Sequence, residues 1–462
     1  MATGRQLSVP RRPAEDRAFC EVERAVPLDE AGRRAATALA VLRLRAELAD
    51  AGRGRDPTAW WCRLFDGDAA PVSRGPVSRG PVSCRPVSCG PVSCGMGKGR
   101  PEEARVGALF EAVEHYLTGP AGFDPATVEP AAPAGIAAGL LRADACAPLL
   151  ARMPGRRMAC LRYRLIGGGG AALVPLFLSA PWYVETGAGR LREPIGDDCD
   201  YADLARYSCN SGSAVGVTTA EALLHALNEA IERDALSLLL VRAFLSGGGF
   251  RPRVIDPATL PHGPARAYAV AEDLTGAPVH LLDITSDIGV PTMLAYTAPT
   301  SRHPHRRGAG TSLSPAYAAW RALTELVQTT LGESLSHTAA PAHGDLAGLA
   351  AHPALYACGR FDLTGPLRDA RAVAFPRAAE AAGPPGAQVR EVTAMLAARG
   401  HPAFHRRVCA LPGGVSAVHV IVPGLERFML ITDGNLVLPG RRGQAAAGRV
   451  SESIPHNWRK YQ

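Results

Sequence analysis

Residues 219–245 read TAEALLHALNEAIERDALSLLLVRAFL and form the longest stretch with helical periodicity in the chain. We predict one long helix here. At 100° per residue, Glu221, Glu229 and Glu232 fall within about 80° of one another around its axis. Apolar residues surround these three glutamates, which predicts a mostly buried helix, and an unpaired carboxylate is costly inside a protein. The helix therefore needs a partner for its acidic face.

A second predicted helix, residues 101–117, carries Glu111 and Glu114 at the same three-residue spacing. Like charges at this spacing repel unless a cation lies between them. Mg²⁺ takes one or two protein carboxylates and completes its shell with water and phosphate oxygens. Two such helices are therefore suited to holding Mg²⁺ against a nucleotide triphosphate. The alternative is that the glutamates pair with Arg105, Arg233 and Arg242 on a solvated face.

The tripeptide Gly97-Lys98-Gly99 precedes the first of these helices. It is not a Walker A loop, because neither Ser nor Thr follows the lysine and no glycine stands five residues before it. Its glycines would still let backbone N–H groups and the ammonium approach an anion closely. Lys98 also stands out because Lys460 is the only other lysine in an arginine-rich chain.

Helices and strands alternate along the chain without a strict βαβ rhythm, which predicts a mixed α/β (α+β) fold with one large catalytic domain. We predict helices at 29–51, ended by Gly52, and at 315–333, and strands at 60–65, 161–165, 172–178, 279–285, 292–296 and 416–422, of which 161–165 and 172–178 form a hairpin. The expected organisation is an irregular N-terminal extension (1–70) with one helix and a short strand, a repeat loop (71–95), the catalytic domain (96–445) and a tail (446–462). Residues 1–27 are polar and arginine-rich and are expected to be loose.

The repeat loop reads PVSRG PVSRG PVSCR PVSCG PVSCG. Proline donates no ladder hydrogen bond, and five residues are too few for a solenoid unit. We therefore expect an exposed, disordered, Pro/Gly-rich loop and assign no chemistry to it.

Composition sets the remaining bounds. The 462 residues are 47% hydrophobic and 20% charged, which is typical of a globular protein. The chain lacks a run of 18 apolar residues and an apolar N-terminal region, so we expect a cytoplasmic protein with no membrane contact. The net charge of +7 comes from scattered residues, which argues against nucleic-acid binding. None of the 11 cysteines has C-x-x-C spacing, which disfavours zinc.

Five ordered sequence blocks together resemble the YcaO family of ATP-dependent peptide-modifying enzymes, from about Val92 to Gly443. They are Gly97-Lys98-Gly99 with Glu111-Ala-Val-Glu114; Ser211-Gly212 through Glu229-Ala-Ile-Glu232-Arg233-Asp234; Asp283 to Pro291; Gly308-Ala-Gly310 with Arg321 to Gln328; and Val422-Pro423-Gly424-Leu425-Glu426. The resemblance implies the YcaO fold and a dependence on ATP and Mg²⁺.

The resemblance also implies roles for individual residues. The Mg²⁺ ligands would be Glu111, Glu114, Glu221, Glu229 and Glu232, the nucleotide would be held by Lys98, Arg233, Arg321 and Gln328, and Glu232 and Arg233 would be catalytic. The family phosphorylates a backbone amide oxygen of a ribosomally made precursor peptide, and a nucleophile then gives an azoline, a thioamide or an amidine. Phosphorylation supplies the leaving group that an amide lacks, while cations neutralise the developing charge.

The ends of the chain bear on the outcome and the partners. Azoline-forming members end in Pro-x-Pro-x-Pro, whereas residues 453–462 contain one proline. Residues 1–60 are predicted to contain only one helix, which is too little structure for a fused precursor-binding domain. We therefore expect a separate recognition protein or a TfuA-like partner, and we also expect a homodimer.

Four positions differ from the family pattern, namely Gly107, His115, Val217 and Thr330, and all four are expected on the nucleotide side. They motivate an alternative, a degenerate and non-catalytic scaffold that binds peptide or a partner protein. A further alternative is an unrelated carboxylate–metal hydrolase, although the chain has no Gly-x-Ser-x-Gly or His-Glu-x-x-His motif. His225 is interpreted as a core or surface histidine rather than a base.

Overall fold

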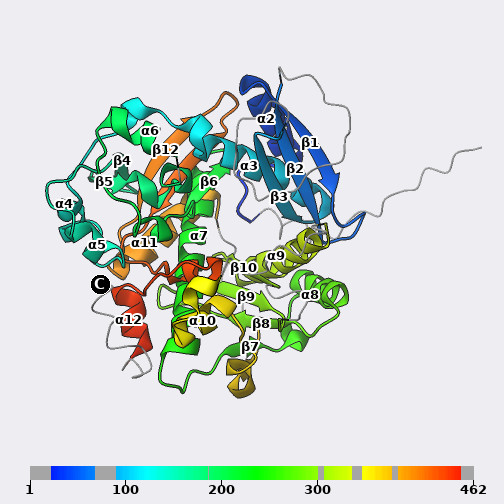
Figure 1. The fold of residues 1–462 in the computed structure, drawn as a ribbon. Coiled ribbons are helices and arrows are strands. Elements are labelled where there is room, and N and C mark those ends of the chain that lie inside the picture. The colour runs from blue at the N-terminus through cyan, green and yellow to red at the C-terminus, as the bar shows by residue number, and fades with distance from the viewer. Residues whose placement is uncertain are drawn as a thin grey trace, which may run out of the picture.

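Three β-sheets and the helices between them build the protein, as Figure 1 shows for the computed structural model. The structure describes residues 22–67, 90–185, 187–299, 306–335, 346–376 and 383–448. The predicted mixed helix-and-sheet fold is confirmed. No helix in these ranges is both long and apolar enough to cross a membrane.

The elements follow one another in a mixed order. The helices are α2 (Leu28–Val41), α3 (Pro101–Thr118), α4 (Pro133–Ala138), α5 (Ala147–Ala151), α6 (Gly189–Arg192), α7 (Thr219–Leu240), α8 (His262–Thr275), α9 (Pro315–Leu335), α10 (Pro353–Arg360), α11 (Pro385–Ala398) and α12 (Arg441–Ala447). The strands are β1 (Leu44–Asp50), β2 (Thr58–Asp66), β3 (Ser93–Gly99), β4 (Cys160–Leu165), β5 (Ala171–Pro175), β6 (Ser213–Gly216), β7 (Arg253–Ile255), β8 (His280–Asp283), β9 (Thr292–Tyr296), β10 (Arg307–Thr311), β11 (Arg371–Val373), β12 (Phe404–Ala410) and β13 (Ser416–Ile421).

The strands form one three-stranded and two five-stranded sheets. The small sheet has the order β1-β2-β3 and is antiparallel. The second has the order β10-β9-β8-β7-β11, in which only β7 and β11 run parallel. The third has the order β5-β4-β12-β13-β6 and is antiparallel, and its β4–β5 pair is the predicted hairpin.

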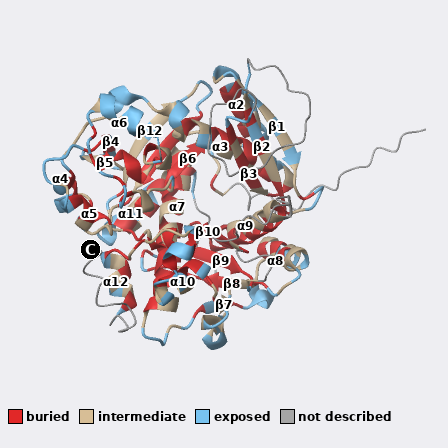
Figure 2. Cartoon of the chain, in the orientation of Figure 1, coloured by how far each residue is buried: buried red, intermediate tan, exposed pale blue. Residues whose placement is uncertain are grey.

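Helix α7 lies between the two large sheets and is red along most of its length in Figure 2, where red marks buried residues. The Thr218 hydroxyl caps the helix by accepting the Glu221 N–H at 3.2 Å. The N-terminal half packs against β6 and β13, with Leu224 in one cluster with Val418. The C-terminal half packs against β9 and β10, with Leu239 in one cluster with Leu294 and Ala309. The predicted helix is confirmed and continues through a π-turn to Leu245.

Three further helices complete the walls around α7. Helices α8 and α9 cover the other face of the β7–β11 sheet, where Leu326 shares a cluster with Leu281 and Met293. Helix α3 lies between the small sheet and β6–β13, because Ala112 shares a cluster with Cys62 and Ala417. As a result β3, α3, α7 and α9 meet at one place (Figure 1).

The predicted helix over residues 29–51 is wrong in its second half. Helix α2 ends at Val41, Arg43 takes a positive φ of 54°, and β1 then pairs with β2 from Leu44↔Asp66 to Asp50↔Trp60. The alternating burial of residues 44–50 fits a half-buried strand, and the hairpin satisfies both backbones. The N-terminal region thus contains a helix and two strands, and β2 pairs with β3 of the large predicted domain.

The predicted repeat loop is also wrong at its end, because residues 93–95 belong to β3. Most of that loop (residues 71–89), the first 21 residues and residues 449–462 of the tail lie outside the described residues.

Candidate active site

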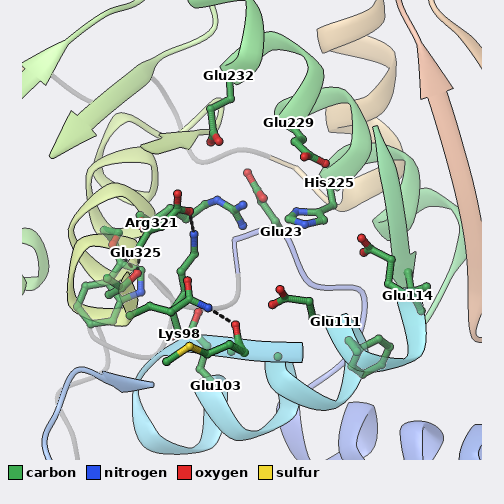
Figure 3. Close-up of a pocket in the computed structure, with 18 of the residues that line it drawn as sticks. Glu23, Lys98, Glu103, Glu111, Glu114, His225, Glu229, Glu232, Arg321 and Glu325 are labelled. Carbon is green, nitrogen blue, oxygen red and sulfur yellow. Dashed lines mark hydrogen bonds and ion pairs between the residues drawn. The ribbon is translucent and has the colours of Figure 1, made fainter. Parts of the chain in front are cut away.

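A cavity of about 480 Å³ opens where β3, α3, α7 and α9 meet, and Glu23 and Arg24 also line it (Figure 3 labels Glu23). Every residue assigned to the site from the sequence lines this cavity: Lys98, Glu111, Glu114, Glu221, Glu229, Glu232, Arg233, Arg321 and Gln328. Segments more than 200 residues apart in sequence therefore contribute to one site. Its volume lies in the range typical of small-molecule pockets.

Helix α7 supplies one acidic wall. The Gly212 N–H donates to Glu229 Oε2 at 3.2 Å, and Arg233 Nη2 donates to Glu229 Oε1 at 3.3 Å. Arg233 Nη1 also lies 4.0 Å from Glu232 Oε1. The side chain of Glu221 is held by the Ala25 N–H, which donates to its Oε2 at 2.9 Å.

The acidic walls on α3 and α7 carry carboxylates that protonate more readily than usual. Burial raises the pKa of Glu111 and of Glu221. Burial, followed by repulsion from Glu229 and Glu111, raises the pKa of Glu114 well above its ordinary value. Burial and repulsion from Glu325 raise the pKa of Glu232 to about 7, although nearby arginines act in the opposite direction. A divalent cation would relieve both the burial and the repulsion.

Lys98 reaches the cavity from a strand, not from a loop. Gly95 and Gly97 let β3 lie directly against α3, because a methyl group at Gly97 would overlap backbone atoms of Ala104 and Ala108. Gly97, next to Lys98, therefore serves close packing and also lines the cavity. The Lys98 ammonium points into the cavity and pairs with Glu325 of α9 (Figure 3).

Helix α9 adds positive charge and fixes the strand. Within the described part of the chain, the Arg321 guanidinium makes no hydrogen bond or ion pair, and its buried Nε has no acceptor. Burial opposes the charge of Arg321, but Tyr317, Glu23 and Glu232 together raise its pKa. Gln328 donates from Nε2 to the Met96 carbonyl and so ties α9 to β3.

Charged cavity residues that the sequence reasoning missed include Glu325, Glu23 and Arg24. Glu325 lies four residues after Arg321, on the same face of α9, so helical spacing could have found it. Glu23 and Arg24 come from a segment that was expected to be loose, and nothing in their local sequence signals the site. His225 also lines the cavity; burial and then the charges of Arg321, Lys98 and Arg24 lower its pKa to about 3, so it is neutral.

The donor set fits Mg²⁺ bound together with phosphate. Among the described residues, no group of three or more His, Cys, Asp or Glu side chains forms a ready-made metal cage. Mg²⁺ needs only one or two carboxylates when water and phosphate oxygens complete its shell. Carboxylates on α3 and α7 stand across the cavity from Lys98 and the unpaired Arg321 (Figure 3), which suits a magnesium–triphosphate ligand.

The alternative that the glutamates pair with arginines fits two of them in part. Arg233 lies 3.3 Å from Glu229 and 4.0 Å from Glu232. Arg105 and Arg242 do not line the cavity, and in the described ranges neither forms an ion pair. The other glutamates lie at the cavity and are not neutralised in this way.

The four positions that depart from the family pattern divide into two pairs. Gly107 and His115 line the cavity, as expected. Val217 is wholly buried in a cluster with Ala31 and Val106, and Thr330 is buried and donates to the Leu326 carbonyl at 2.7 Å. The expectation that all four line the nucleotide side is therefore wrong for Val217 and Thr330.

Comparisons with solved structures agree with this arrangement. The chain is similar to YcaO from Methanopyrus kandleri bound with AMPPCP and Mg²⁺, with a TM-score of 0.60 and 17% identity over 94% of this chain and 98% of that one. It is also similar to a heterocyclase in complex with substrate and cofactor (TM-score 0.57, 15% identity, 90% of this chain and 56% of that one). A third similar structure is the Escherichia coli microcin synthetase McbBCD complex with pro-MccB17 bound (TM-score 0.50, 13% identity, 82% and 88%). These likenesses concern the fold.

Curated relatives match over a shorter stretch. An uncharacterized protein in the tfuA 3′ region of Rhizobium leguminosarum bv. trifolii is 36% identical over 132 residues, which are 26% of this chain. An uncharacterized protein of Methanothermobacter thermautotrophicus is 36% identical over 126 residues, again 26% of this chain. The chain spans only 30% and 31% of the length of these two relatives.

A family model matches most of the chain. The model described as YcaO cyclodehydratase, ATP- and Mg²⁺-binding, covers residues 96–426, from the strand that bears Lys98 to Glu426. The chain therefore belongs to the YcaO family, whose cofactors are ATP and Mg²⁺.

Proposed function

We propose that this protein activates a backbone amide of a ribosomally made precursor peptide by ATP- and Mg²⁺-dependent phosphorylation of the amide oxygen. The observation that carries the proposal is one cavity in which carboxylates of α3 and α7 face Lys98 and Arg321 (Figure 3). Membership of an ATP- and Mg²⁺-binding family supports the nucleotide. The described contents of two similar structures, a heterocyclase with substrate and McbBCD with pro-MccB17, support a peptide substrate.

Different residues of the cavity would bind Mg²⁺, bind the phosphates and neutralise developing charge. The glutamates that would hold Mg²⁺ are Glu111, Glu114, Glu221, Glu229 and Glu232. Lys98 and Arg321 would bind phosphate oxygens, and Arg321 is suited to this because its guanidinium is unpaired. Arg233 is oriented by Glu229 and would neutralise charge on the transferring group. Gln328 would help to hold the nucleotide by fixing β3, the strand that bears Lys98, through its hydrogen bond to the Met96 carbonyl.

ATP supplies the phosphoryl group that turns the amide oxygen into a leaving group. The cavity contributes position and charge, since its cations already stand where negative charge develops. Glu232 lines the cavity beside Arg233, so as a Mg²⁺ ligand it would place the cation next to the transferring phosphoryl group. We assign the catalytic roles to Glu232 and Arg233 on these grounds.

The modification that follows activation is an azoline, a thioamide or an amidine. The rhizobial relative, described as lying in the tfuA 3′ region, supports a TfuA-like partner for this chain. A homodimer and a cytoplasmic location belong to the same proposal. Mass spectrometry of the treated peptide separates loss of water from exchange of oxygen for sulfur.

The test uses the full chain and, as candidate precursor peptides, synthetic peptides for any short reading frames beside its gene. We expect peptide-dependent release of ADP and phosphate, and transfer of an isotopic label from the peptide amide oxygen to the phosphate. Glu232→Gln should abolish both, whereas Glu102→Gln, at an exposed position outside the cavity, should not. Phosphate release without label transfer would contradict amide phosphorylation.

A non-catalytic scaffold is the second candidate, and two substitutions inside the cavity, Gly107 and His115, favour it. That function requires peptide or partner binding without nucleotide turnover. A wild-type chain that binds the peptide but not ATP with Mg²⁺ would support the scaffold over the enzyme.

A further inference from the structure

Residues 22–27, here named the N-terminal strap, enter the active-site cavity from outside the region that the family model covers. Helix α11 holds its start, because Gln388 Nε2 donates to the Val22 carbonyl at 2.6 Å. Helix α7 holds its middle, because the Ala25 N–H donates to Glu221 Oε2 at 2.9 Å. The strap is therefore fixed on both sides of Glu23 and Arg24, the two strap residues that line the cavity.

Glu23 is the buried residue of the strap, and it points into the cavity. Asn228 of α7 donates from Nδ2 to Glu23 Oε1 at 3.0 Å, and the side chain is 8% exposed. Ser312, just before α9, forms a second side-chain hydrogen bond with this carboxylate. Figure 3 places the carboxylate between Arg321 on one side and His225 and Glu229 on the other. Two side chains therefore hold the carboxylate at the cavity, and because each carboxylate oxygen can accept more than one bond, it can still bind a cation.

The arrangement argues against a carboxylate that simply fills the place of a phosphate. Such a mimic would take the N–H groups of Arg321, yet this guanidinium makes no hydrogen bond or ion pair to any described residue. The cavity also keeps about 480 Å³ with the strap in place, within the range of ligand pockets. Burial raises the pKa of the Glu23 carboxyl, and Arg321, Ser312 and Asn228 offset this only in part, so a further cation would stabilise its charged form.

We propose that Glu23 is a further residue of the nucleotide site, a carboxylate that contacts Mg²⁺ directly or through one of its waters. The inference rests on the proposed function, since it assumes Mg²⁺ and ATP in this cavity. Mg²⁺ accepts a small number of carboxylates beside phosphate oxygens, and Glu23 offers one next to the cation, Arg321, that is best placed for phosphate. The strap then completes the site with a residue that lies outside residues 96–426.

The test is isothermal titration of ATP into the full-length Glu23→Gln protein, once with Mg²⁺ and once with EDTA. The amide oxygen of glutamine can still accept the Asn228 hydrogen bond, so the strap keeps its anchor. We expect ATP with Mg²⁺ to bind at least tenfold more weakly than to wild type. In EDTA we expect affinity to stay equal or to increase, because a negative charge near the phosphates is removed.

Glu102→Gln is the matched control, since Glu102 is exposed and does not line the cavity. Equal melting temperatures for wild type and both variants show that the fold is retained. The proposal is overturned if Glu23→Gln binds ATP with Mg²⁺ as well as or better than wild type. It is also overturned if ATP affinity falls equally with Mg²⁺ and with EDTA, because that result would mean that Glu23 only anchors the strap. Absence of binding by the wild type would instead overturn the proposed function, and this inference with it.

Discussion

Lys98 of β3 and Glu325 of α9 form an ion pair that joins the three-stranded sheet to the helix across the cavity. Burial raises the pKa of the Glu325 carboxyl, but Lys98, with Arg233 and Arg321, outweighs burial and lowers it. Glu325 is thus charged at neutral pH, and Lys98 is held where it can also reach a phosphate. A nucleotide bound as we propose would compete with Glu325 for the same ammonium.

Replacing Lys98 with methionine should lower both stability and ATP affinity. The change leaves the partly buried Glu325 without its nearest partner. We expect this to lower the free energy of unfolding by about 1–2 kcal/mol, a modest loss because both side chains keep some exposure to solvent. We expect ATP affinity to fall at least tenfold. The double variant Lys98→Met/Glu325→Gln should recover most of the stability but not the affinity, in urea unfolding and calorimetric titration. Recovery of both would mean that Lys98 acts only as a structural partner.

Gly97→Ala should disrupt the contact between β3 and α3. The added methyl group would overlap backbone atoms of Ala104 and Ala108, which cannot move without separating the strand from the helix. We expect a loss of about 3 kcal/mol or more in the free energy of unfolding, measured by thermal denaturation. Gly90→Ala is the control, because no atom lies within 4 Å of its added methyl group. Equal melting temperatures for the two variants would rule out this packing role.

His419 should make the protein less stable in acid. Its Nδ1 accepts the Tyr163 O–H at 2.9 Å and its Nε2–H donates to the Ser211 carbonyl at 3.2 Å, a pattern that requires the neutral ring. Burial lowers the pKa of His419 to about 4, against about 6.5 in an unfolded chain. The unfolded state therefore binds the proton first as pH falls.

The contribution of this ring is full above about pH 6.5 and is lost as pH falls toward 4, by about 3 kcal/mol in total. Urea unfolding of wild type and His419→Gln across this interval measures it. We expect the difference in unfolding free energy between the two proteins to shrink steadily toward acid. A difference that does not change with pH would show that the buried ring is not the titrating group.

The elements that the sequence predicted correctly are those with one dominant period. Helices α7 and α9 have long apolar faces, and strands such as β9 are short and wholly buried. Residues 44–50 were assigned to a helix because their small and apolar residues fit either period. These residues form a strand because they pair with β2, which is a tertiary contact that the local sequence does not reveal.

Some residues of the candidate site could be predicted from local sequence patterns, and others could not. The glutamates of α3 and α7 could be found because helical spacing places them on one face each. Glu325 was within reach of the same reasoning. Glu23 could not be found in this way, because two long-range hydrogen bonds fix its position. Asn228 donates to Glu23 itself from 205 positions away, and Gln388 donates to the neighbouring Val22 from 366 positions away. Such long-range contacts leave no local pattern in the sequence.

The central claim is that acidic side chains of α3 and α7 bind a divalent cation that holds ATP. Calorimetric titration of ATP with Mg²⁺ into wild type and Glu232→Gln, at about pH 6 and about pH 8, tests it most directly. Because the pKa of Glu232 is about 7, a proton competes with Mg²⁺ at the lower pH. We predict tight wild-type binding at the higher pH, weaker binding at the lower pH, and weak binding by Glu232→Gln at both. Wild-type binding that needs no Mg²⁺, or a Glu232→Gln protein that matches wild type at both pH values, would contradict the claim.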